Sequence, residues 1–307
     1  MKIAVTGGAG FIGSHIVDAY IEEGHEVVVI DNLSTGLKEN VNPKARFIEI
    51  DITDPEIPEI FAEERFDILS HHAAQANVRE SVREPGFDAQ VNIIGGINLY
   101  EAARESGVKK IIFSSTGGAI YGEQKYFPAD ERHPKRPCSP YGVSKLANEK
   151  YLVYYKTIHN IEHVIFRYTN VYGPRQNPKG EAGVVAIFIS KMLAGEQPVI
   201  YGDGTQTRDY NFIDDVVRAN VLALDDKAKG IYNCSTSEEH SVNTIFRILK
   251  YRMGSDAEEV YGPAQEGEQA RSVCSHRKLL KALGWKPETN LEKGLIKTIE
   301  WFRANQG

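Results

Sequence analysis

Apolar runs and amphipathic segments alternate along the first half of the chain. The apolar runs are short and rich in Val, Ile and Phe, a length and composition that predict buried strands. The segments between them place apolar residues at helical spacing. The predicted strands cover residues 2–6, 26–30, 46–50, 67–70, 110–114 and 163–167, and the predicted helices cover residues 11–23, 87–105 and 140–159. Strands that alternate with helices in this way predict an α/β protein with a Rossmann-type, doubly wound parallel sheet.

The pattern changes after the Gly-Pro-Arg sequence at residues 173–175. Proline, glycine and polar turns become frequent, and the apolar segments shorten. Helices are predicted over residues 185–194, 216–224, 243–251 and 291–304, with brief strands between them. We therefore expect a large sheet domain over residues 1–173, to which part of the later chain returns. Residues 174–307 are expected to form a smaller C-terminal α/β lobe that binds a substrate.

The composition excludes several classes of protein. The 307 residues are 41% hydrophobic and 25% charged, and their net charge is −6, as in an ordinary globular protein. Acidic and basic residues are interspersed, so no nucleic-acid-binding surface is expected. The chain runs from Met1 directly into a predicted strand, so we expect no signal peptide. No apolar run approaches the roughly 20 residues that span a bilayer, so no membrane partner is expected.

The cysteines and histidines do not predict a metal site. Cys138, Cys234 and Cys274 are isolated and far apart in the sequence, a pattern that favours neither a disulfide framework nor a zinc site. Free cysteines are typical of the reducing cytoplasm, where we expect this protein. His71 and His72 are adjacent in a predicted strand, and adjacent strand residues point to opposite faces. No bound metal is therefore expected.

The sequence opens with a glycine-rich turn between a strand and a helix. Gly7, Gly10 and Gly13 follow a G-x-x-G-x-x-G spacing. Glycine permits a positive φ in such a turn and lets backbone N–H groups approach a pyrophosphate closely. The helix that begins near Phe11 and Ile12 adds the partial positive charge of its N-terminus. The turn therefore predicts a binding site for a dinucleotide.

The second predicted strand ends at an acidic residue that selects between two dinucleotides. Asp31 lies 18 residues beyond Gly13, and no arginine follows it before Arg46. A carboxylate at this position accepts hydrogen bonds from an adenosine ribose diol and repels a 2′-phosphate. The sequence therefore favours NAD over NADP as the cofactor.

Two further strand ends carry candidate cofactor contacts. Asp51 and Ile52 follow the third strand, where a carboxylate either reaches the adenine amino group or caps the next turn. Sequence alone leaves both interpretations open. After the fourth strand, Ala73, Ala74 and Gln75 place small residues where a cofactor would lie against the backbone.

Two Tyr-x-x-x-Lys pairs are candidates for the catalytic base. Tyr121 and Lys125 lie in a segment without helical periodicity, so the two side chains need not be neighbours. Tyr141 and Lys145 follow Ser139-Pro140, a favourable N-cap with proline at the first helical position. The spacing of four residues then puts both side chains on one helix face. We therefore expect Tyr141 and Lys145 to form the catalytic pair.

The chemistry of this pair suits hydride transfer at a secondary alcohol. A free phenol has a pKa of about 10. A nearby ammonium group and a positive nicotinamide ring both lower that pKa, which makes the phenolate of Tyr141 a base near neutral pH. A hydroxyl after the fifth strand is expected to relay the proton. Thr116 is the first choice, because it is predicted to lie past the strand end, and Ser115 is the alternative.

These motifs together resemble a known family, the extended short-chain dehydrogenases/reductases, and within it the UDP-glucose (UDP-galactose) 4-epimerase family. The resemblance covers essentially the whole chain. Besides the catalytic pair, it is carried by residues 6–13, 31–36, 92–96, 167–175, 202–204, 208–210 and 284–285. It implies a 4-epimerase that keeps NAD bound, removes hydride from C4 of a UDP-sugar, and returns it to the other face of a 4-keto intermediate.

The resemblance also implies roles for individual residues. The adenosine side of NAD would be held by Asp31, Asn32, Ser34 and Gly36. The nicotinamide half would be flanked by Asn92 and Tyr168, and Ser114 would also contact the cofactor. The substrate diphosphate would bind Asn170, with Gly183 and Val184 near the sugar nucleotide. Arg208 would pair with a phosphate oxygen, a suitable task for a guanidinium group.

Other functions of the same fold stay open as alternatives. Related dehydratases carry an acid and a base directly after the threonine of the fifth strand, whereas this chain has Gly117 and Gly118 after Thr116. Dehydration is therefore disfavoured, while a sugar-nucleotide decarboxylase or reductase remains possible. A non-catalytic NAD-sensing or scaffold protein is a further alternative, against which the intact Tyr141 and Lys145 argue.

The chain departs from the family pattern at three places. The loop after the fifth strand is one residue longer than in many relatives, which would displace Thr116. Gln265 stands where the family often has a phosphate-binding arginine, and Arg271 is a candidate substitute. Ser272 aligns with a tyrosine that narrows the sugar pocket in some members, so N-acetylated UDP-hexosamines are expected as additional substrates.

The resemblance implies a homodimer built on two helices from each subunit. The candidates here are the predicted helices over residues 87–105 and 141–159. Both carry apolar residues, which on the second helix include Leu146, Tyr151, Leu152, Tyr154 and Tyr155. Sequence alone leaves open whether these residues lie in the core or at a subunit interface.

Overall fold

A parallel sheet forms the centre of the molecule. The computed structural model describes residues 1–178, 183–264 and 269–305. Within these residues the sheet has seven strands, and every neighbouring pair is parallel. In sheet order they are β11 (Gly230–Cys234), β6 (Glu162–Tyr168), β5 (Lys110–Thr116), β4 (Ile68–His71), β1 (Lys2–Thr6), β2 (Glu26–Asp31) and β3 (Arg46–Glu49). The predicted doubly wound α/β fold is confirmed.

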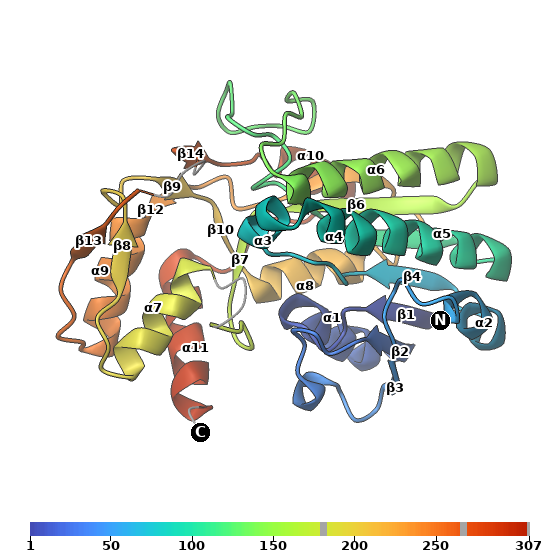
Figure 1. Cartoon of the computed structure of the whole chain (residues 1–307), viewed down its shortest axis with the longest axis horizontal. Coiled ribbons are helices and arrows are strands. Elements are labelled where there is room, and N and C mark those ends of the chain that lie inside the picture. The colour runs from blue at the N-terminus through green and yellow to red at the C-terminus, as the bar shows by residue number, and fades with distance from the viewer. Residues whose placement is uncertain (179–182, 265–268, 306–307) are drawn as a thin grey trace.

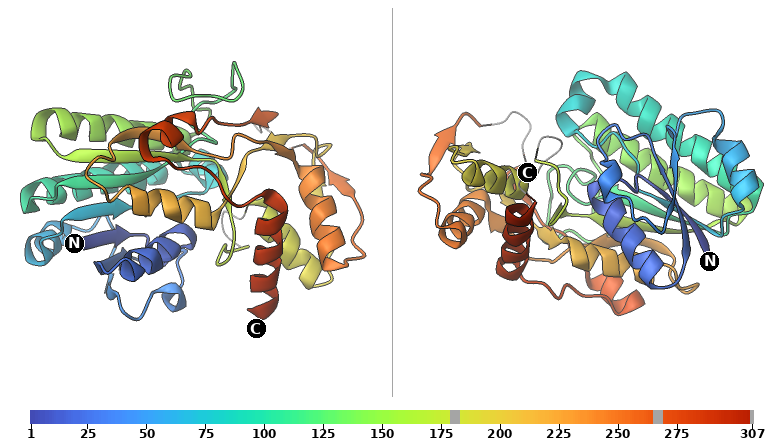
Figure 2. Two further views of the ribbon diagram at one scale, coloured as in Figure 1. Left: turned by 180° about the vertical axis from the view of Figure 1, so that it is seen from behind. Right: turned by 90° about the horizontal axis from the view of Figure 1, so that it is seen from below.

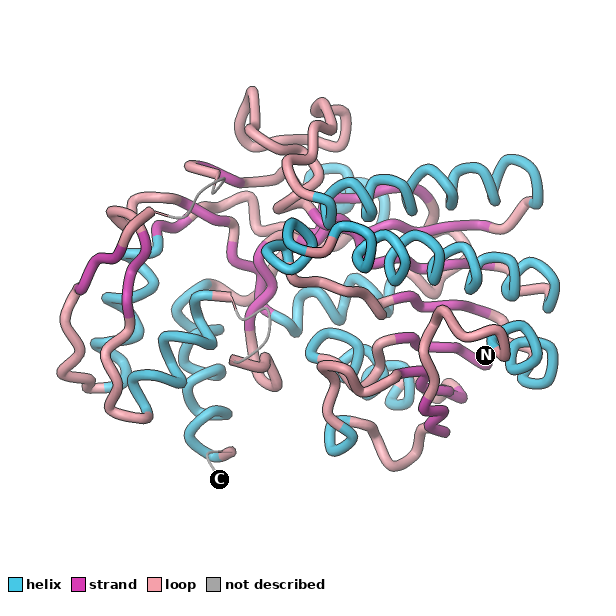
Figure 3. The backbone as a smooth tube through the Cα atoms, in the orientation of Figure 1, coloured by secondary structure: helices cyan, strands magenta, loops and turns pink. Residues whose placement is uncertain are grey.

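Helices cover both faces of this sheet (Figures 1 and 3). Successive residues of β1 point to opposite faces, and they accordingly contribute to different core clusters: Ile3 and Val5 to one, Ala4 to the other. The first cluster includes residues of α1 (Phe11–Glu22) and α8 (Ile213–Leu222), which pack against each other. The second includes residues of α2 (Ile57–Glu64), α5 (Gly95–Ser106) and α6 (Pro140–His159).

The helix α6 begins and ends where the sequence predicts. The Oγ atom of its N-cap, Ser139, accepts a hydrogen bond from the N–H of Gly142 at 3.2 Å. Pro140 occupies the first turn, where its missing N–H has no cost. Asn160, in the left-handed conformation, ends the helix. The helix packs against β5 and β6, which holds its N-terminal turn at the carboxyl edge of the sheet.

The predicted helix over residues 87–105 is interrupted. It consists of α4 (Pro85–Ala89), a π-helical turn over Gln90–Ile94, and α5. Gly107 ends α5 with a positive φ, as its position in the sequence indicates. Single π turns often occur at functional sites, and this one contains Asn92. The short helices α2, α3 (Val78–Arg83) and α10 (Arg277–Leu283), and a 3₁₀ turn at Lys38–Asn40, were not predicted.

The second half of the chain builds a smaller lobe beside the sheet (Figure 2). Its helices are α7 (Val184–Leu193), α9 (Val242–Met253) and α11 (Leu291–Ala304). Its strand pairings are β8 (Val199–Tyr201) with β13 (Val260–Gly262), β7 (Asn170–Tyr172) with β10 (Tyr210–Phe212), and β9 (Thr207–Arg208) between β12 (His240–Ser241) and β14 (Arg271–Ser272). The strand β11 and the helix α8 return to the large sheet. The boundary at residue 173 stays a prediction.

One hydrophobic core joins the two parts. The cluster beneath α1 and α8 continues from Phe166 on β6 to Phe188 on α7 and Phe246 on α9. The lobe is therefore packed against the sheet rather than tethered to it. Among the described residues, no helix combines the length and apolarity needed to cross a membrane.

Candidate active site

The glycine-rich turn packs so closely that side chains are excluded. Gly7 has φ +69°, and a Cβ atom there would lie 2.6 Å from the backbone nitrogen of Ala73. A Cβ atom on Gly13 would overlap the carbonyl oxygen of Gly7. Gly10 precedes α1, which has no side-chain cap. The N–H groups of the first turn, at Phe11 and Ile12, are thus suited to an anionic ligand.

Asp31 ties the glycine-rich turn to the loop that follows β2. Its buried carboxylate accepts hydrogen bonds from the N–H of Ala9 at 2.9 Å and from the N–H of Leu33 at 2.8 Å. The carbonyl of Ala9 accepts in turn from the N–H of Leu37 at 3.0 Å. Gly36 approaches Ala9 so closely that a Cβ atom would lie 2.9 Å from the Cβ of Ala9. The two loops therefore form one wall, as expected of an adenosine-binding site.

Asp51 acts as a turn cap in this structure. One carboxylate oxygen accepts from the N–H and the hydroxyl of Thr53, at 2.8 and 2.6 Å, and the other accepts from Asn32 Nδ2 at 2.6 Å. Burial acts to raise the pKa of Asp51, but the bonds from Thr53 and Asn32 outweigh it, so the pKa is lowered. Asn32 also accepts from the N–H of Ser34 at 3.0 Å. Of the two interpretations, capping is observed, and an adenine contact by Asp51 or the buried Ile52 stays a prediction.

The π turn places Asn92 against the segment that follows β4. Asn92 Oδ1 accepts from the N–H of Gln75 at 2.9 Å, and Asn92 Nδ2 donates to the carbonyl of Gln75 at 2.8 Å. These two hydrogen bonds fix the backbone of the segment. The N–H of Ala73 adds a hydrogen bond to Thr6 Oγ1 at 3.2 Å. Asn92 is buried. The geometry therefore shows Asn92 shaping the wall formed by residues 73–75, and its contact with a nicotinamide stays a prediction.

Tyr141 and Lys145 lie together at the carboxyl edge of β5. Lys145 Nζ donates to the carbonyl of Ser114 at 2.8 Å and lies 5.8 Å from the centre of the Tyr141 ring. The Lys145 side chain is buried. Burial, and next the charge of Lys145, lower the pKa values of His71 and His72 at the end of β4. The charge of Lys145 therefore acts on titratable groups at this edge of the sheet.

The two candidate hydroxyls point to opposite sides of β5. Thr116 is the last residue of the strand, so the expectation that it lies past the strand end is wrong: pairing with Tyr168 on β6 extends the strand. Thr116 Oγ1 and Asn170 Oδ1 lie 3.8 and 3.9 Å from the position a Cβ atom would take on Gly118, so both side chains lie near this glycine. Ser115 instead donates its hydroxyl to Glu149 at 2.7 Å. The hydroxyl of Ser115 is thus engaged by Glu149, and the role of Thr116 as the relay stays a prediction.

The competing Tyr121 belongs to the core. Its side chain is buried, and its hydroxyl donates to Asn233 Oδ1 at 2.6 Å and accepts from Arg167 Nη1 at 2.9 Å. Burial raises the pKa of Tyr121. This placement supports the choice of Tyr141 as the base.

Tyr168 also contributes its side chain to the core. Its hydroxyl donates to Asn220 Oδ1 at 3.1 Å, on the α8 side of the sheet, and burial raises its pKa well above the usual value. A family role beside the nicotinamide would have to use the backbone of Tyr168. The sequence pattern identifies the residue but does not show which face of β6 it occupies.

The three-stranded sheet of the lobe separates the two candidate phosphate ligands. Ser272 on β14 is in register with Arg208 on β9, and Arg271 is in register with Thr207. Since paired residues share a face and successive residues alternate, Ser272 and Arg208 lie on one face and Arg271 on the other. The expectation that Arg271 joins Arg208 at the substrate is therefore not supported by this arrangement.

Arg271 has partners of its own on its side of the sheet. It forms an ion pair with Glu239, which raises the pKa of Arg271, and its guanidinium lies 4.0 Å from the ring centre of Phe127. Glu239 also accepts a hydrogen bond from Thr207 Oγ1 at 2.5 Å. Gln265, which Arg271 was expected to replace, lies outside the described residues.

Gly183 and Val184 begin the lobe at α7. Gly183 is the N-cap of this helix and has no side-chain capping bond. A Cβ atom on it would lie 3.3 Å from Gln176 Nε2, which donates to the carbonyl of Val171 at 3.2 Å. Val171 follows Asn170 on β7. The start of α7 thus lies beside the strand that carries the predicted diphosphate ligand.

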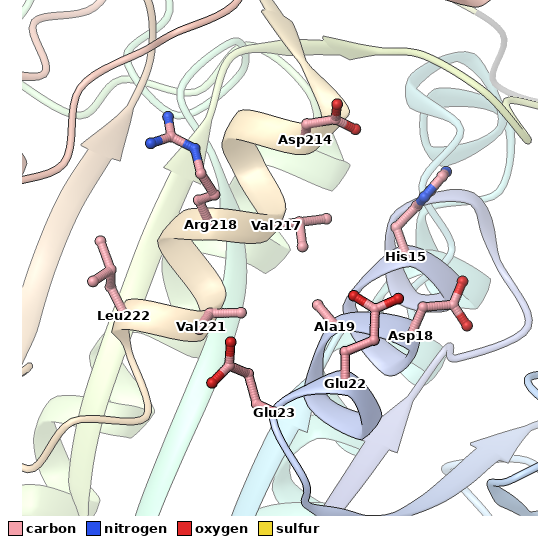
Figure 4. A pocket seen from close by; sticks show the side chains of 10 residues that line it. All are labelled: His15, Asp18, Ala19, Glu22, Glu23, Asp214, Val217, Arg218, Val221 and Leu222. Atoms are coloured by element: carbon pink, nitrogen blue, oxygen red, sulfur yellow. The ribbon is translucent and has the colours of Figure 1, made fainter.

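A groove of about 590 Å³ lies elsewhere, between α1 and α8 (Figure 4). On one side it is lined by Asp18 and Glu22 of α1 and by Glu23, which ends that helix, and on the other by Val217 and Val221 of α8. Its lining does not include Tyr141, Lys145 or Thr116. The groove is therefore separate from the candidate active site.

Comparison with known proteins identifies the class that this fold and site define. The profile of the NAD dependent epimerase/dehydratase family matches residues 3–235, about three quarters of the chain. The chain belongs to this family.

The similar proteins narrow the comparison further. A putative UDP-glucose 4-epimerase of Methanocaldococcus jannaschii is 48% identical over 303 residues, with 99% of each chain covered. A UDP-glucose 4-epimerase of Mycolicibacterium smegmatis is 41% identical, also with 99% of each covered.

Solved structures of 4-epimerases are also similar to this chain. The UDP-glucose 4-epimerase of Thermotoga maritima with UDP-glucose has a TM-score of 0.97 and 49% identity, covering 100% of both chains. That of Thermus thermophilus with NAD has a TM-score of 0.95 and 44% identity, covering 99% of this chain and 100% of its own. A UDP-N-acetylglucosamine 4-epimerase of Methanobrevibacter ruminantium has a TM-score of 0.94 and 37% identity, covering 99% of each.

Proposed function

We propose that this protein is an NAD-dependent UDP-glucose 4-epimerase that interconverts UDP-glucose and UDP-galactose. The observation that carries the proposal is the position of Tyr141 and Lys145 at the end of β5, at the edge of the sheet that also carries the glycine-rich turn after β1 and Asp31 at the end of β2. Similarity over 99% of the chain to UDP-glucose 4-epimerases supports it.

The residues of the site fit NAD. The close approach of Gly13 to Gly7 leaves backbone N–H groups for a pyrophosphate, and the carboxylate of Asp31 suits an unphosphorylated ribose. When NAD is bound, it supplies the acceptor for the hydride at C4 of the sugar. The other proposed contacts are Gly10, Phe11, Ile12, Asn32, Ser34, Gly36, Asp51, Ile52, Ala73, Ala74, Gln75, Asn92, Ser114 and Tyr168.

The proton transfer is assigned to residues of α6 and β5. The phenolate of Tyr141, which the charge of Lys145 stabilises, takes the proton of the sugar 4-hydroxyl through Thr116. Ser114 holds Lys145 in place through its carbonyl oxygen, at 2.8 Å. The 4-keto sugar then turns over, C4 regains the hydride on its other face, and Tyr141 returns the proton to O4.

The diphosphate is assigned to residues around β7 and β9. The amide of Asn170 and the hydroxyl of Thr116 both lie near Gly118, and the proposed site continues to the start of α7 at Gly183 and Val184. Arg208 supplies the positive charge that a diphosphate requires. With these contacts fixed, the sugar is free to rotate while the nucleotide stays bound.

Ser272 is proposed to widen the sugar pocket. It is buried and shares a face of the three-stranded sheet with Arg208. A serine leaves space that a larger side chain would fill, so UDP-N-acetylglucosamine and UDP-N-acetylgalactosamine are proposed as further substrates. The similarity to a UDP-N-acetylglucosamine 4-epimerase supports this proposal.

A homodimer is proposed through the helices α4, α5 and α6. Leu152 and Tyr155, which the sequence left open between the core and this surface, are buried in the core, and Leu146 is partly buried. Apolar side chains that are more than a third exposed nevertheless remain on these helices and on the intervening π turn: Phe87, Ile94, Val143, Tyr151, Val153, Tyr154 and Ile158. Exposed apolar side chains on neighbouring helices are typical of a subunit interface. A cytoplasmic location is proposed because the three cysteines are free thiols.

Conversion of sugar nucleotides tests the proposed activity. The purified protein, without added cofactor, is incubated with UDP-galactose and with UDP-glucuronic acid, and the products are analysed by mass spectrometry and chromatography. We expect UDP-glucose of unchanged mass from UDP-galactose, and NAD among the molecules released on denaturation. A product lighter by water or carbon dioxide would instead favour a dehydratase or a decarboxylase.

A further inference from the structure

A buried ion pair connects α6 to the central sheet behind the candidate active site. Arg167 on β6 donates from Nε and Nη2 to the two carboxylate oxygens of Glu149 on α6, at 2.8 and 2.6 Å. Each side chain is only 2% exposed. Burying two charges costs several kcal/mol per ion, and a well-packed apolar pair is often at least as stable. Stability alone is therefore a weak reason for this pair.

The pair is joined to the strand that ends at the active site. Glu149 Oε1 also accepts the hydroxyl of Ser115 at 2.7 Å, and one helical turn earlier Lys145 donates to the carbonyl of Ser114 at 2.8 Å. Tyr141 lies one further turn toward the start of α6. Two successive residues of β5 are thus bonded to two residues of α6 that lie one turn apart. These bonds set the position of the helix along the strand.

The guanidinium group of Arg167 also binds the segment that follows β5. Its Nη1 donates to the hydroxyl of Tyr121 at 2.9 Å, and Tyr121 donates to Asn233 on β11 at 2.6 Å. Arg167 is in register with Ser115. Arg167 therefore connects β6 to α6 through Glu149 and, through Tyr121, to the segment that follows β5 and to β11.

We infer that Glu149 and Arg167 are positioning residues of the proposed epimerase: through Ser115 they hold Tyr141 and Lys145 on α6 in register with Thr116 on β5. The inference rests on the proposed function, because it assumes that these three groups act together. Neither charge needs to contact substrate or cofactor. A displacement of about 1 Å at reacting groups can cost on the order of 100-fold in rate, so residues that prevent such a displacement can matter for catalysis.

Ser115→Ala is the most selective test, since it cuts the link to β5 and leaves the ion pair intact. We expect kcat for UDP-galactose to fall by about 10-fold, with KM and the bound NAD changed by less than about two-fold, because the displaced groups act in the transition state. Glu149→Gln, which leaves Arg167 without its countercharge, should lower kcat further and also lower Tm. The matched control is Tyr155→Phe, which removes the bond from α6 to Glu101 on α5 and should leave kcat unchanged.

A second readout needs no substrate. Tyrosine ionisation is followed by ultraviolet absorbance in the NAD-loaded protein and in the same protein carrying Tyr141→Phe. The difference between the two titration curves isolates the ionisation of Tyr141. We expect this ionisation to move to higher pH in Ser115→Ala, because Lys145 is less well placed. Asp88 on α4, and His71 and His72 at the end of β4, also feel the charge of Lys145, and these variants leave them in place.

The outcomes separate the inference from the proposed function. If the wild type does not convert UDP-sugars, the proposed function fails, while the titration still decides whether Ser115 positions the pair. If the wild type is active but Ser115→Ala and Glu149→Gln keep its kcat and its Tyr141 titration and lose only Tm, the ion pair is merely structural and the inference is overturned. A rise in KM alone would overturn it as well.

Discussion

Gly13 lies directly against Gly7, with no room for a side chain between the start of α1 and the end of β1. A Cβ atom on Gly13 would overlap backbone atoms, which cannot move without distorting the turn. We expect Gly13→Ala to reduce the NAD that copurifies with the protein by at least about 10-fold and to lower Tm. Gly86→Ala is the control, because a Cβ atom there meets nothing within 4 Å. NAD content equal to that of the wild type in Gly13→Ala would show that the turn does not bind the pyrophosphate.

Asp209 should make the stability of the lobe depend on pH. Its fully buried carboxylate accepts from Thr236 and Thr169 on one oxygen and from the N–H groups of Ser237 and Cys274 on the other. Burial raises the pKa of Asp209 from 3.8 to about 6, and the hydrogen bonds oppose this only in part. Between these pH values the folded protein holds more protons than the unfolded chain, so this group lowers stability as pH rises from about 4 to about 6.

Urea unfolding of the wild type and of Asp209→Asn tests this sign. The variant loses hydrogen-bond acceptors, so its free energy of unfolding should be lower than that of the wild type at every pH. The difference between the two free energies should shrink by up to about 3 kcal/mol between pH 4 and pH 7. Asp226→Asn, which changes an exposed carboxylate, is the control. A difference that grows with pH would contradict the raised pKa.

Ser272 should control which sugars are accepted. Because it is buried beside Arg208, a tyrosine at this position would project into the proposed sugar pocket. We expect Ser272→Tyr to reduce turnover of UDP-N-acetylgalactosamine relative to UDP-galactose by about 10-fold or more, and Ser272→Ala to leave the ratio unchanged. The kcat/KM values for both substrates provide the measurement. An unaltered ratio in Ser272→Tyr would place the pocket elsewhere.

Arg208 and Arg271 should behave differently although they lie on neighbouring strands. Loss of a charge-assisted bond to phosphate predicts that Arg208→Ala raises KM for UDP-galactose by about 10- to 100-fold. Arg271 is half-exposed and paired with Glu239 on the other face of the sheet, so Arg271→Ala should change KM by less than about two-fold. Equal increases in KM would mean that both guanidinium groups reach the substrate.

Capping residues and turn glycines, which act locally, allowed several elements to be predicted from the sequence. The helix α6 matches the prediction at both ends. Its start is marked by the N-cap Ser139 and by Pro140 in the first turn. The helix α11 matches as well, and the Asn290 side chain caps its start. The glycine-rich turn and Asp31 were recognisable because their geometry follows from residue type and spacing.

Features that depend on tertiary contacts were not predictable in the same way. The π turn is stabilised from outside, because Asn148 on α6 donates to the carbonyl of Asn92 at 2.9 Å. The extension of β5 to Thr116 requires its partner β6. The face that Arg271 occupies depends on the register of a strand of two residues, which no local pattern encodes.

The most direct test of the account follows the hydrogen on C4 of the sugar. UDP-glucose carrying deuterium at C4 is incubated in ordinary water with the purified protein and no added cofactor, and the product is separated and weighed by mass spectrometry. Hydride transfer through bound NAD predicts UDP-galactose of unchanged mass that retains the deuterium, and no conversion by Tyr141→Phe. Loss of the deuterium to solvent, or full activity without the Tyr141 hydroxyl, would contradict hydride transfer assisted by this tyrosine.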